Sequence, residues 1–112
     1  MNSRQKGARG EREWRDQLRA AGYTARRGQQ FAGGTDSPDV ICDELGSVIH
    51  FEVKRVESLN LAAAMAQAQR DSAGKVPVVA HRKNSQPWLV TMPAEALFKL
   101  MRDGIEGLKT TP

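Results

Sequence analysis

Two acidic residues and one lysine in this chain could form a metal-dependent hydrolytic centre on neighbouring strands. Asp39 follows Pro38 at the start of one strand candidate, and Glu52 and Lys54 lie two residues apart in the next. Side chains alternate between the faces of a strand, so Glu52 and Lys54 share one face. Carboxylate oxygens suit Mg²⁺ or Mn²⁺, which can polarise a phosphoryl oxygen and activate a water. The lysine could orient that water or neutralise charge in the transition state.

A third acid, Glu11, is predicted to lie on the inward face of the first helix. Trp14 and Leu18 follow it at helical spacing, so Glu11 shares the apolar stripe that faces the core. Glu13, by the same periodicity, points away. A carboxylate on the buried stripe of a basic helix is unusual, and we expect Glu11 to support the centre as a ligand, directly or through water.

Simpler interpretations exist for the same residues. A strand with the pattern Glu-x-Lys commonly forms an ordinary ion pair on an exposed sheet face. His50 shares the face of Glu52 and Lys54, and a polar residue near a strand end is a commoner explanation for it than a general base. The combination of Asp39 on the preceding strand with the inward Glu11 favours the metal centre over an isolated ion pair.

The elements that position these residues follow from periodicity and turn residues. Helices are predicted at 6–21, 59–73 and 93–102, and strands at 23–27, 38–42, 48–54, 76–82 and 88–92. A polar, glycine-rich loop is predicted over 28–37. The order α-β-β-β-α-β-β-α indicates an α/β (α+β) fold, a mixed central sheet flanked by helices. Because a helix joins the third strand to the fourth, these two are expected to be parallel with a right-handed crossover.

Length and composition limit the protein to one domain, residues 1–112, with frayed ends at about 1–4 and 104–112. The 39% apolar residues suffice for a single core. No apolar run is long enough for a transmembrane helix or a signal peptide, so we expect a cytoplasmic protein with no membrane partner. Cys42 cannot form an internal disulfide, and it is expected to be a small buried residue in a strand.

Positive charge is concentrated at the N-terminal end. Residues 1–30 hold eight basic and three acidic side chains, whereas the remaining 82 residues hold nine basic and ten acidic ones. This distribution fits a polyanionic partner as well as a solvated helix face. If the partner is DNA, the side chains expected to contact its backbone are Arg9, Arg12, Arg26, Arg27 and Arg55.

Two segments of the chain resemble a known nuclease superfamily. Ser37-Pro38-Asp39, followed by residues 51–55 (FEVKR), resembles the PD-(D/E)xK motif of restriction-endonuclease-like nucleases. Residues 6–13 (KGARGERE) and 18–23 resemble the first helix of archaeal-type Holliday-junction resolvases. The chain is also similar to small resolvase-like nucleases of phages and prophages. The resemblance covers roughly residues 5–82.

The resemblance implies a restriction-endonuclease-like core and specific roles for the site residues. The catalytic residues would be Glu11, Asp39, Glu52 and Lys54. Mg²⁺ or Mn²⁺ would be held by Asp39, Glu52, the carbonyl of Val53 and, through water, Glu11. Members of the resolvase family act as homodimers on branched or four-way DNA.

The second helix offers two further polar candidates, Gln67 and Gln69. Gln69 is expected near the core-facing edge of the helix and Gln67 well away from it, and a surface or capping role is the commoner one for each. The function that the sequence predicts is a metal-dependent DNA endonuclease, resembling a Holliday-junction resolvase. The alternatives are a less structure-specific phage nuclease that nicks or repairs DNA, and a non-catalytic nucleic-acid-binding module of the same fold.

Overall fold

The computed structural model describes residues 3–28 and 38–109. All but the first residue of the predicted loop over 28–37 lies outside the described residues. In the described part, a five-stranded sheet has the order β1-β2-β3-β4-β5. Its strands are β1 (Ala25–Arg27), β2 (Val40–Cys42), β3 (Ile49–Arg55), β4 (Val76–Arg82) and β5 (Leu89–Thr91). Strands β3 and β4 are parallel, as predicted, and the other neighbouring pairs are antiparallel.

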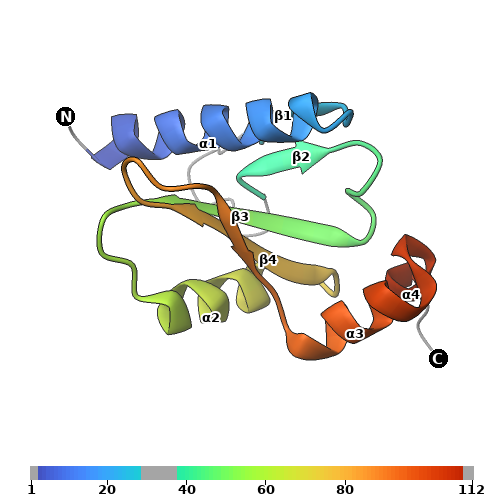
Figure 1. The fold of residues 1–112 in the computed structure, drawn as a ribbon. Helices are drawn as coiled ribbons and strands as arrows, with labels where there is room; N and C mark the ends of the chain where they lie inside the picture. The colour runs from blue at the N-terminus through green and yellow to red at the C-terminus, as the bar shows by residue number, and fades with distance from the viewer. Residues whose placement is uncertain (1–2, 29–37, 110–112) are drawn as a thin grey trace.

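Two helices cover opposite faces of this sheet. Helix α1 (Ser3–Ala20) lies along one face and α2 (Leu61–Asp71), which connects β3 to β4, lies along the other (Figure 1). Asn60 caps α2, because its side chain accepts a hydrogen bond from the N–H of Ala63. Helices α3 (Ala94–Asp103) and α4 (Ile105–Lys109) follow β5. The first eight elements confirm the predicted order, and α4 is added to it.

The packing on the two faces fixes the direction of every β3 side chain. Phe51 and Val53 pack with Trp14 in the core beneath α1, where the rings of Trp14 and Phe51 meet edge to face at 5.7 Å. Val79 of β4 packs on the opposite face, against Ala64 and Ala68 of α2. Because side chains alternate along a strand, the even-numbered residues of β3 point toward α2.

The buried Cys42 behaves as the sequence indicates. Its side chain lies in the core beneath α1 and is only 1% exposed. Burial raises the pKa of the thiol, and the neighbouring carboxylate of Glu44 acts in the same direction. A thiol of this kind is inert, so the structural interpretation of Cys42 is confirmed.

Helical structure extends into both of the ends that were expected to be frayed, as far as residues 3 and 109. Helix α1 already begins at Ser3, and α4 continues the folded chain to Lys109. Gly104, with a φ of 65°, ends α3 and donates its N–H to Leu100 O. Gly107 then lies so close to α3 that an added Cβ would stand 2.7 Å from the Lys99 carbonyl oxygen. The polar composition of this tail concealed the close packing.

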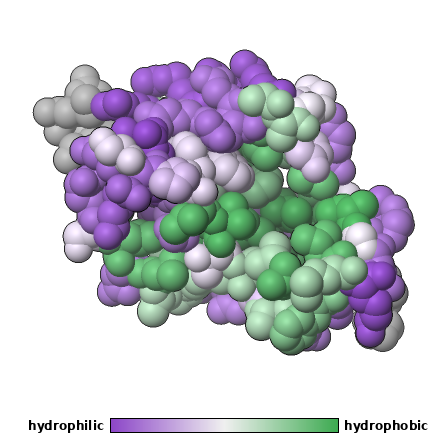
Figure 2. Space-filling model, viewed as in Figure 1, coloured by the Kyte–Doolittle hydropathy of each residue, from purple (hydrophilic) through white to green (hydrophobic). Residues whose placement is uncertain are grey.

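One face of the molecule is unusually apolar. The side chains involved come from β5 and α3 and are between 42% and 68% exposed: Leu89, Val90, Leu97, Phe98 and Met101. We call these five residues the apolar face. Figure 2 shows hydrophobic residues gathered over this region, in contrast to the hydrophilic surface of α1. None of the helices in the described ranges is both long and apolar enough to cross a bilayer.

Candidate active site

Asp39 is attached to β3 on both sides of Glu52. Its backbone N–H donates to the carbonyl oxygen of Phe51 at 3.0 Å, and its Oδ2 accepts the N–H of Val53 at 2.8 Å. Strand β2 begins only at the next residue, Val40, which pairs with Phe51. The carboxylate of Asp39 therefore accepts the N–H of Val53 in place of a backbone carbonyl, at the point where β2 and β3 separate. This bond holds the carboxylate of Asp39 at the N–H of Val53, the residue that follows Glu52.

Glu52 is buried in the middle of β3 and contacts His50. The two side chains point toward α2 from alternate positions, with exposed fractions of 3% and 2%. His50 Nε2 and Glu52 Oε1 are 2.9 Å apart. His50 does lie near the start of β3, as expected, but it is not a solvent-facing polar residue. It is fully enclosed, because α2 covers this face of the sheet.

Lys54 also points toward α2 and reaches a glutamine there. Its Nζ donates to Gln67 Oε1 at 3.2 Å. Gln69, by contrast, is exposed, so the expected placement of the two glutamines is reversed. The buried side chains of α2 are Ala64 and Ala68. The face of α2 that points to the sheet therefore lies closer to Gln67 than the predicted apolar stripe, which included Met65.

Glu11 is buried, as predicted, but its partner is Arg27 at the end of β1. Arg27 Nε and Nη2 donate to Glu11 Oε1 at 3.1 and 3.0 Å. Glu11 comes from α1 and Glu52 points toward α2, so the two acids approach the sheet from opposite faces. Within residues 3–28 and 38–109, no three His, Cys, Asp or Glu side chains form a cluster that could hold a metal. The described residues therefore do not form a direct three-carboxylate site that includes Glu11.

The donors near Asp39 nevertheless fit a hard divalent cation. Val76 N–H bonds to Val48 O, so the even-numbered residues of β3 direct their backbone groups toward β4. The N–H and C=O of a strand residue point to the same edge, so the carbonyl of Val53 faces the side of Asp39. One carbonyl and two carboxylates make an all-oxygen set, and Mg²⁺ usually takes only one or two protein carboxylates.

Four of the five arginines expected at DNA form ion pairs within the protein. Arg26 pairs with Asp43, Arg27 with Glu11, and both Arg9 and Arg55 pair with Glu13. The side chain of Arg55 is only 12% exposed, whereas those of Arg9, Arg26 and Arg27 are 41–59% exposed. Arg12 is exposed and makes no ion pair with another described residue. Of the exposed arginines only Arg27 contacts Glu11, and Arg55 is the least accessible of the set.

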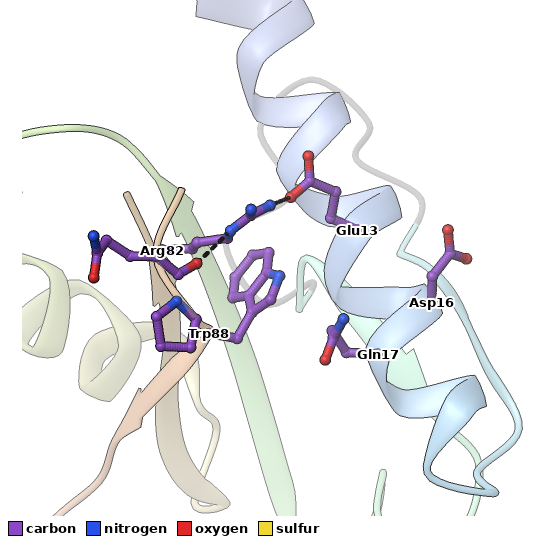
Figure 3. A pocket seen from close by; sticks show the side chains of 7 residues that line it. Glu13, Asp16, Gln17, Arg82 and Trp88 are labelled. Carbon is purple, nitrogen blue, oxygen red and sulfur yellow. Dashed lines mark hydrogen bonds and ion pairs between the residues drawn. The ribbon is translucent and has the colours of Figure 1, made fainter. Parts of the chain in front are cut away.

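Glu13, which was expected to point away from the core, joins three elements through arginines. Its carboxylate accepts from Arg55 at 2.9 Å, from Arg82 at 2.6 Å and from Arg9 at 3.1 Å. Partial burial would raise the pKa of Glu13, but hydrogen bonds from Arg55 and Arg82 outweigh it, and the pKa lies below its ordinary value. Figure 3 shows Arg82 reaching Glu13 beside Trp88, at a cavity of about 450 Å³.

A larger cavity, of about 840 Å³, lies where β3 and β4 end. Its lining comes from 57–59 and Leu61 on one side and from 81–84, 86–87 and Leu89 on the other, and His81, Arg82 and Lys83 contribute basic groups. His81 is in register with Lys54 across the parallel pair and contacts Thr91 Oγ1 at 2.9 Å. Burial lowers the pKa of His81. This cavity adjoins the lysine end of the candidate site.

Comparisons with known proteins agree with this geometry. A sequence profile of the family described as archaeal Holliday junction resolvase (Hjc) matches residues 2–105. The solved structure of Hjc from Archaeoglobus fulgidus, described as a Holliday junction resolvase from an archaeal hyperthermophile, has a TM-score of 0.57 and 28% sequence identity. That match covers 78% of this chain and 72% of the other. No curated protein sequence matches the chain. The predicted fold class is confirmed.

Proposed function

Because this chain belongs to the archaeal Holliday junction resolvase family, and is therefore a resolvase-like nuclease acting on DNA, we propose that it cuts four-way junctions with a divalent cation at β2 and β3. The observation that carries the proposal is the double attachment of Asp39 to β3, beside Glu52. It brings together the two chemical requirements of such a centre, paired carboxylates and a nearby amine, at β3.

Asp39, Glu52 and the carbonyl of Val53 would hold Mg²⁺ or Mn²⁺, and Glu11 would act through water. When bound, such an ion supplies Lewis acidity to the phosphodiester and activates a water for attack. Glu52 has one carboxylate oxygen engaged with His50, so its other oxygen is the one for the cation. Glu11 is held by Arg27, which fixes its carboxylate at the end of β1.

Lys54 would stabilise charge that develops on the scissile phosphate. Its ammonium group lies two positions from Glu52 on the same face, and Gln67 fixes its direction by accepting one of its three donors. The two other donors are then available to the phosphate or to the attacking water. Electrostatic groups that are fixed in advance need no reorganisation when the transition state forms.

The DNA backbone would be contacted by Arg9, Arg12, Arg26 and Arg27, which are exposed on α1 and β1. Arg55 would act indirectly, because it holds α1 to the end of β3 through Glu13. The basic cavity at His81, Arg82 and Lys83 would receive the part of the DNA strand that extends beyond Lys54. Contacts of this kind position the duplex without reading its sequence, and they weaken with added salt.

The apolar face would join two copies of the chain, so that two centres cut opposing strands. Edge strand β5 and helix α3 expose Leu89, Val90, Phe98 and Met101, large apolar side chains that water solvates poorly. Stable dimers bury roughly 1,200–2,000 Å² in total. A strand edge and one helix face from each copy can contribute to an area of that size.

We expect Phe98→Asp to convert the dimer to a monomer, because it places a charge at the centre of the apolar face. Light scattering coupled to gel filtration would measure the mass. On a junction, the monomer should nick single strands but lose the paired, symmetric cuts. Tyr23→Asp, at an exposed aromatic residue outside the apolar face, should remain dimeric. A dimeric Phe98→Asp protein would place the subunit contact elsewhere.

The proposed function is tested by comparing a four-way junction with a linear duplex of the same sequence, in Mg²⁺, Mn²⁺ or EDTA. Paired symmetric cuts on the junction alone, abolished by EDTA, are expected. Equal cutting of the linear duplex would indicate a nuclease of broader specificity. Binding without cutting in either metal would indicate a non-catalytic module. Cutting that persists in EDTA would exclude the metal mechanism.

A further inference from the structure

His50 and Glu52 form an enclosed polar pair in a part of the sheet that is otherwise apolar. Both side chains are at least 96% buried, and they lie 2.9 Å apart. Strand β4 presents Pro77 opposite His50 and Val79 opposite Glu52, so it offers neither side chain a polar group. Burying a carboxylate and an imidazole is unfavourable unless each satisfies the other. The imidazole of His50 and the carboxylate of Glu52 therefore each depend on the other for a hydrogen-bond partner.

We propose that His50 is a positioning residue that orients the Glu52 carboxylate for the divalent cation. This inference rests on the proposed function. An ionised carboxylate only accepts hydrogen bonds, so His50 Nε2 must carry the proton and donate it to Oε1. That bond fixes the rotation of the carboxylate, and Oε2 is then the oxygen directed to the cation. Among the described residues, no other side chain shares a hydrogen bond with Glu52.

A role in packing alone would not require an imidazole at this position. An apolar side chain of similar volume would fill the space beneath α2, and it would avoid the cost of burying a polar ring. Hydrogen-bond partners of metal-ligating carboxylates typically change metal affinity or activity 10–100-fold when they are removed. A positioning role thus predicts an effect on metal binding that is separable from any effect on folding.

The test compares three substitutions at His50 by direct titration of Mn²⁺ into the DNA-free protein in a calorimeter. In His50→Gln the side-chain amide extends to about the place of Nε2, whereas the amide of His50→Asn stops nearer the ring's Nδ1. His50→Leu has no donor. We expect Mn²⁺ affinity within about threefold of wild type for His50→Gln, and about 10–100-fold weaker binding for His50→Asn and His50→Leu.

The same order of variants should appear in junction cleavage, as a change in the Mg²⁺ concentration that cleavage requires. The Mg²⁺ concentration for half-maximal cutting should rise in His50→Asn and His50→Leu, while the rate at saturating Mg²⁺ recovers most of its wild-type value. Ser72→Ala is the control, since Ser72 is a buried polar residue whose Oγ donates to the Gln69 carbonyl oxygen at the end of α2 and to no residue of the proposed centre. Its Mn²⁺ affinity should equal that of wild type.

Equal Mn²⁺ affinity in wild type, His50→Gln and His50→Asn would overturn the inference, even if melting temperatures differ. The comparison of His50→Gln with His50→Asn decides the question if His50→Leu fails to fold, because both retain a polar side chain. A wild-type protein that neither binds Mn²⁺ nor cuts a junction would contradict the proposed function itself. Wild-type binding and cutting with unaffected His50 variants would contradict only the role of His50.

Discussion

Asp39→Asn is expected to reduce junction cleavage about a thousandfold, or roughly 4 kcal/mol of transition-state stabilisation, with little change in the fold. Asparagine keeps an oxygen that can accept the N–H of Val53, so the attachment to β3 survives. The negative charge that attracts the cation is lost. Single-turnover cleavage in saturating Mg²⁺ measures the effect, and thermal melting measures the fold.

Junction affinity without metal should be unchanged or slightly tighter in Asp39→Asn, because the substitution removes a negative charge near the phosphates. Asp43→Asn is a suitable control, since it neutralises an exposed acid at the other end of β2 and should alter cleavage less than about twofold. Wild-type cutting by Asp39→Asn would move the active site away from β2 and β3. A large loss of thermal stability would instead make Asp39 a structural residue.

Gly28→Ala should reduce cleavage by at least about 100-fold although it changes no chemical group of the centre. Gly28 donates its N–H to Asp39 O at 2.9 Å, and an added Cβ would stand 2.0 Å from the carbonyl oxygen of Pro38. Backbone atoms cannot rotate away as a flexible side chain can, so Pro38 and Asp39 must shift. Single-turnover cleavage and Mn²⁺ titration should both be impaired, because the carboxylate of Asp39 moves with its backbone.

Gly7→Ala is the matched control for this substitution. Its Cβ would meet nothing within 4 Å, on the exposed side of α1. Alanine is favoured over glycine inside a helix by roughly 0.5–1 kcal/mol, so Gly7→Ala should melt slightly higher and cut normally. A Gly28→Ala protein that cuts at the wild-type rate would show that the contact between residue 28 and Pro38 does not fix Asp39.

Local periodicity was sufficient to predict the sides on which the principal residues lie. The alternation in β3 places Glu52 and Lys54 on one face because a strand has a period of two. The helical repeat of Glu11, Trp14 and Leu18 likewise predicts that all three face inward, and all three are buried. The roles assigned to Asp39, Glu52, Lys54 and Glu11 remain proposals, since geometry alone does not test catalysis.

Features that depend on distant residues could not be predicted in this way. Glu13 was expected to point away because its helix was considered alone, whereas two of its arginine partners, Arg55 and Arg82, come from β3 and β4. The burial of His50 depends on α2 covering that face. The contact of Lys54 with Gln67 depends on the rotation of α2 about its own axis. Burial of Ala64 and Ala68, and not of Met65, sets that rotation.

The strand pairings differ greatly in the number of paired residues, and we expect this difference to set the order in which the pairings form during folding. Seven residues of β3 pair with β4, each with a partner 27 positions later in the chain, whereas β2 and β3 pair only at Val40 and Phe51. We therefore expect the extensive pairing of β3 with β4 to stabilise the sheet before the short hairpin of β2 and β3 does. On this order Asp39 would dock on a strand that is already assembled, and the proposed centre would form late in folding.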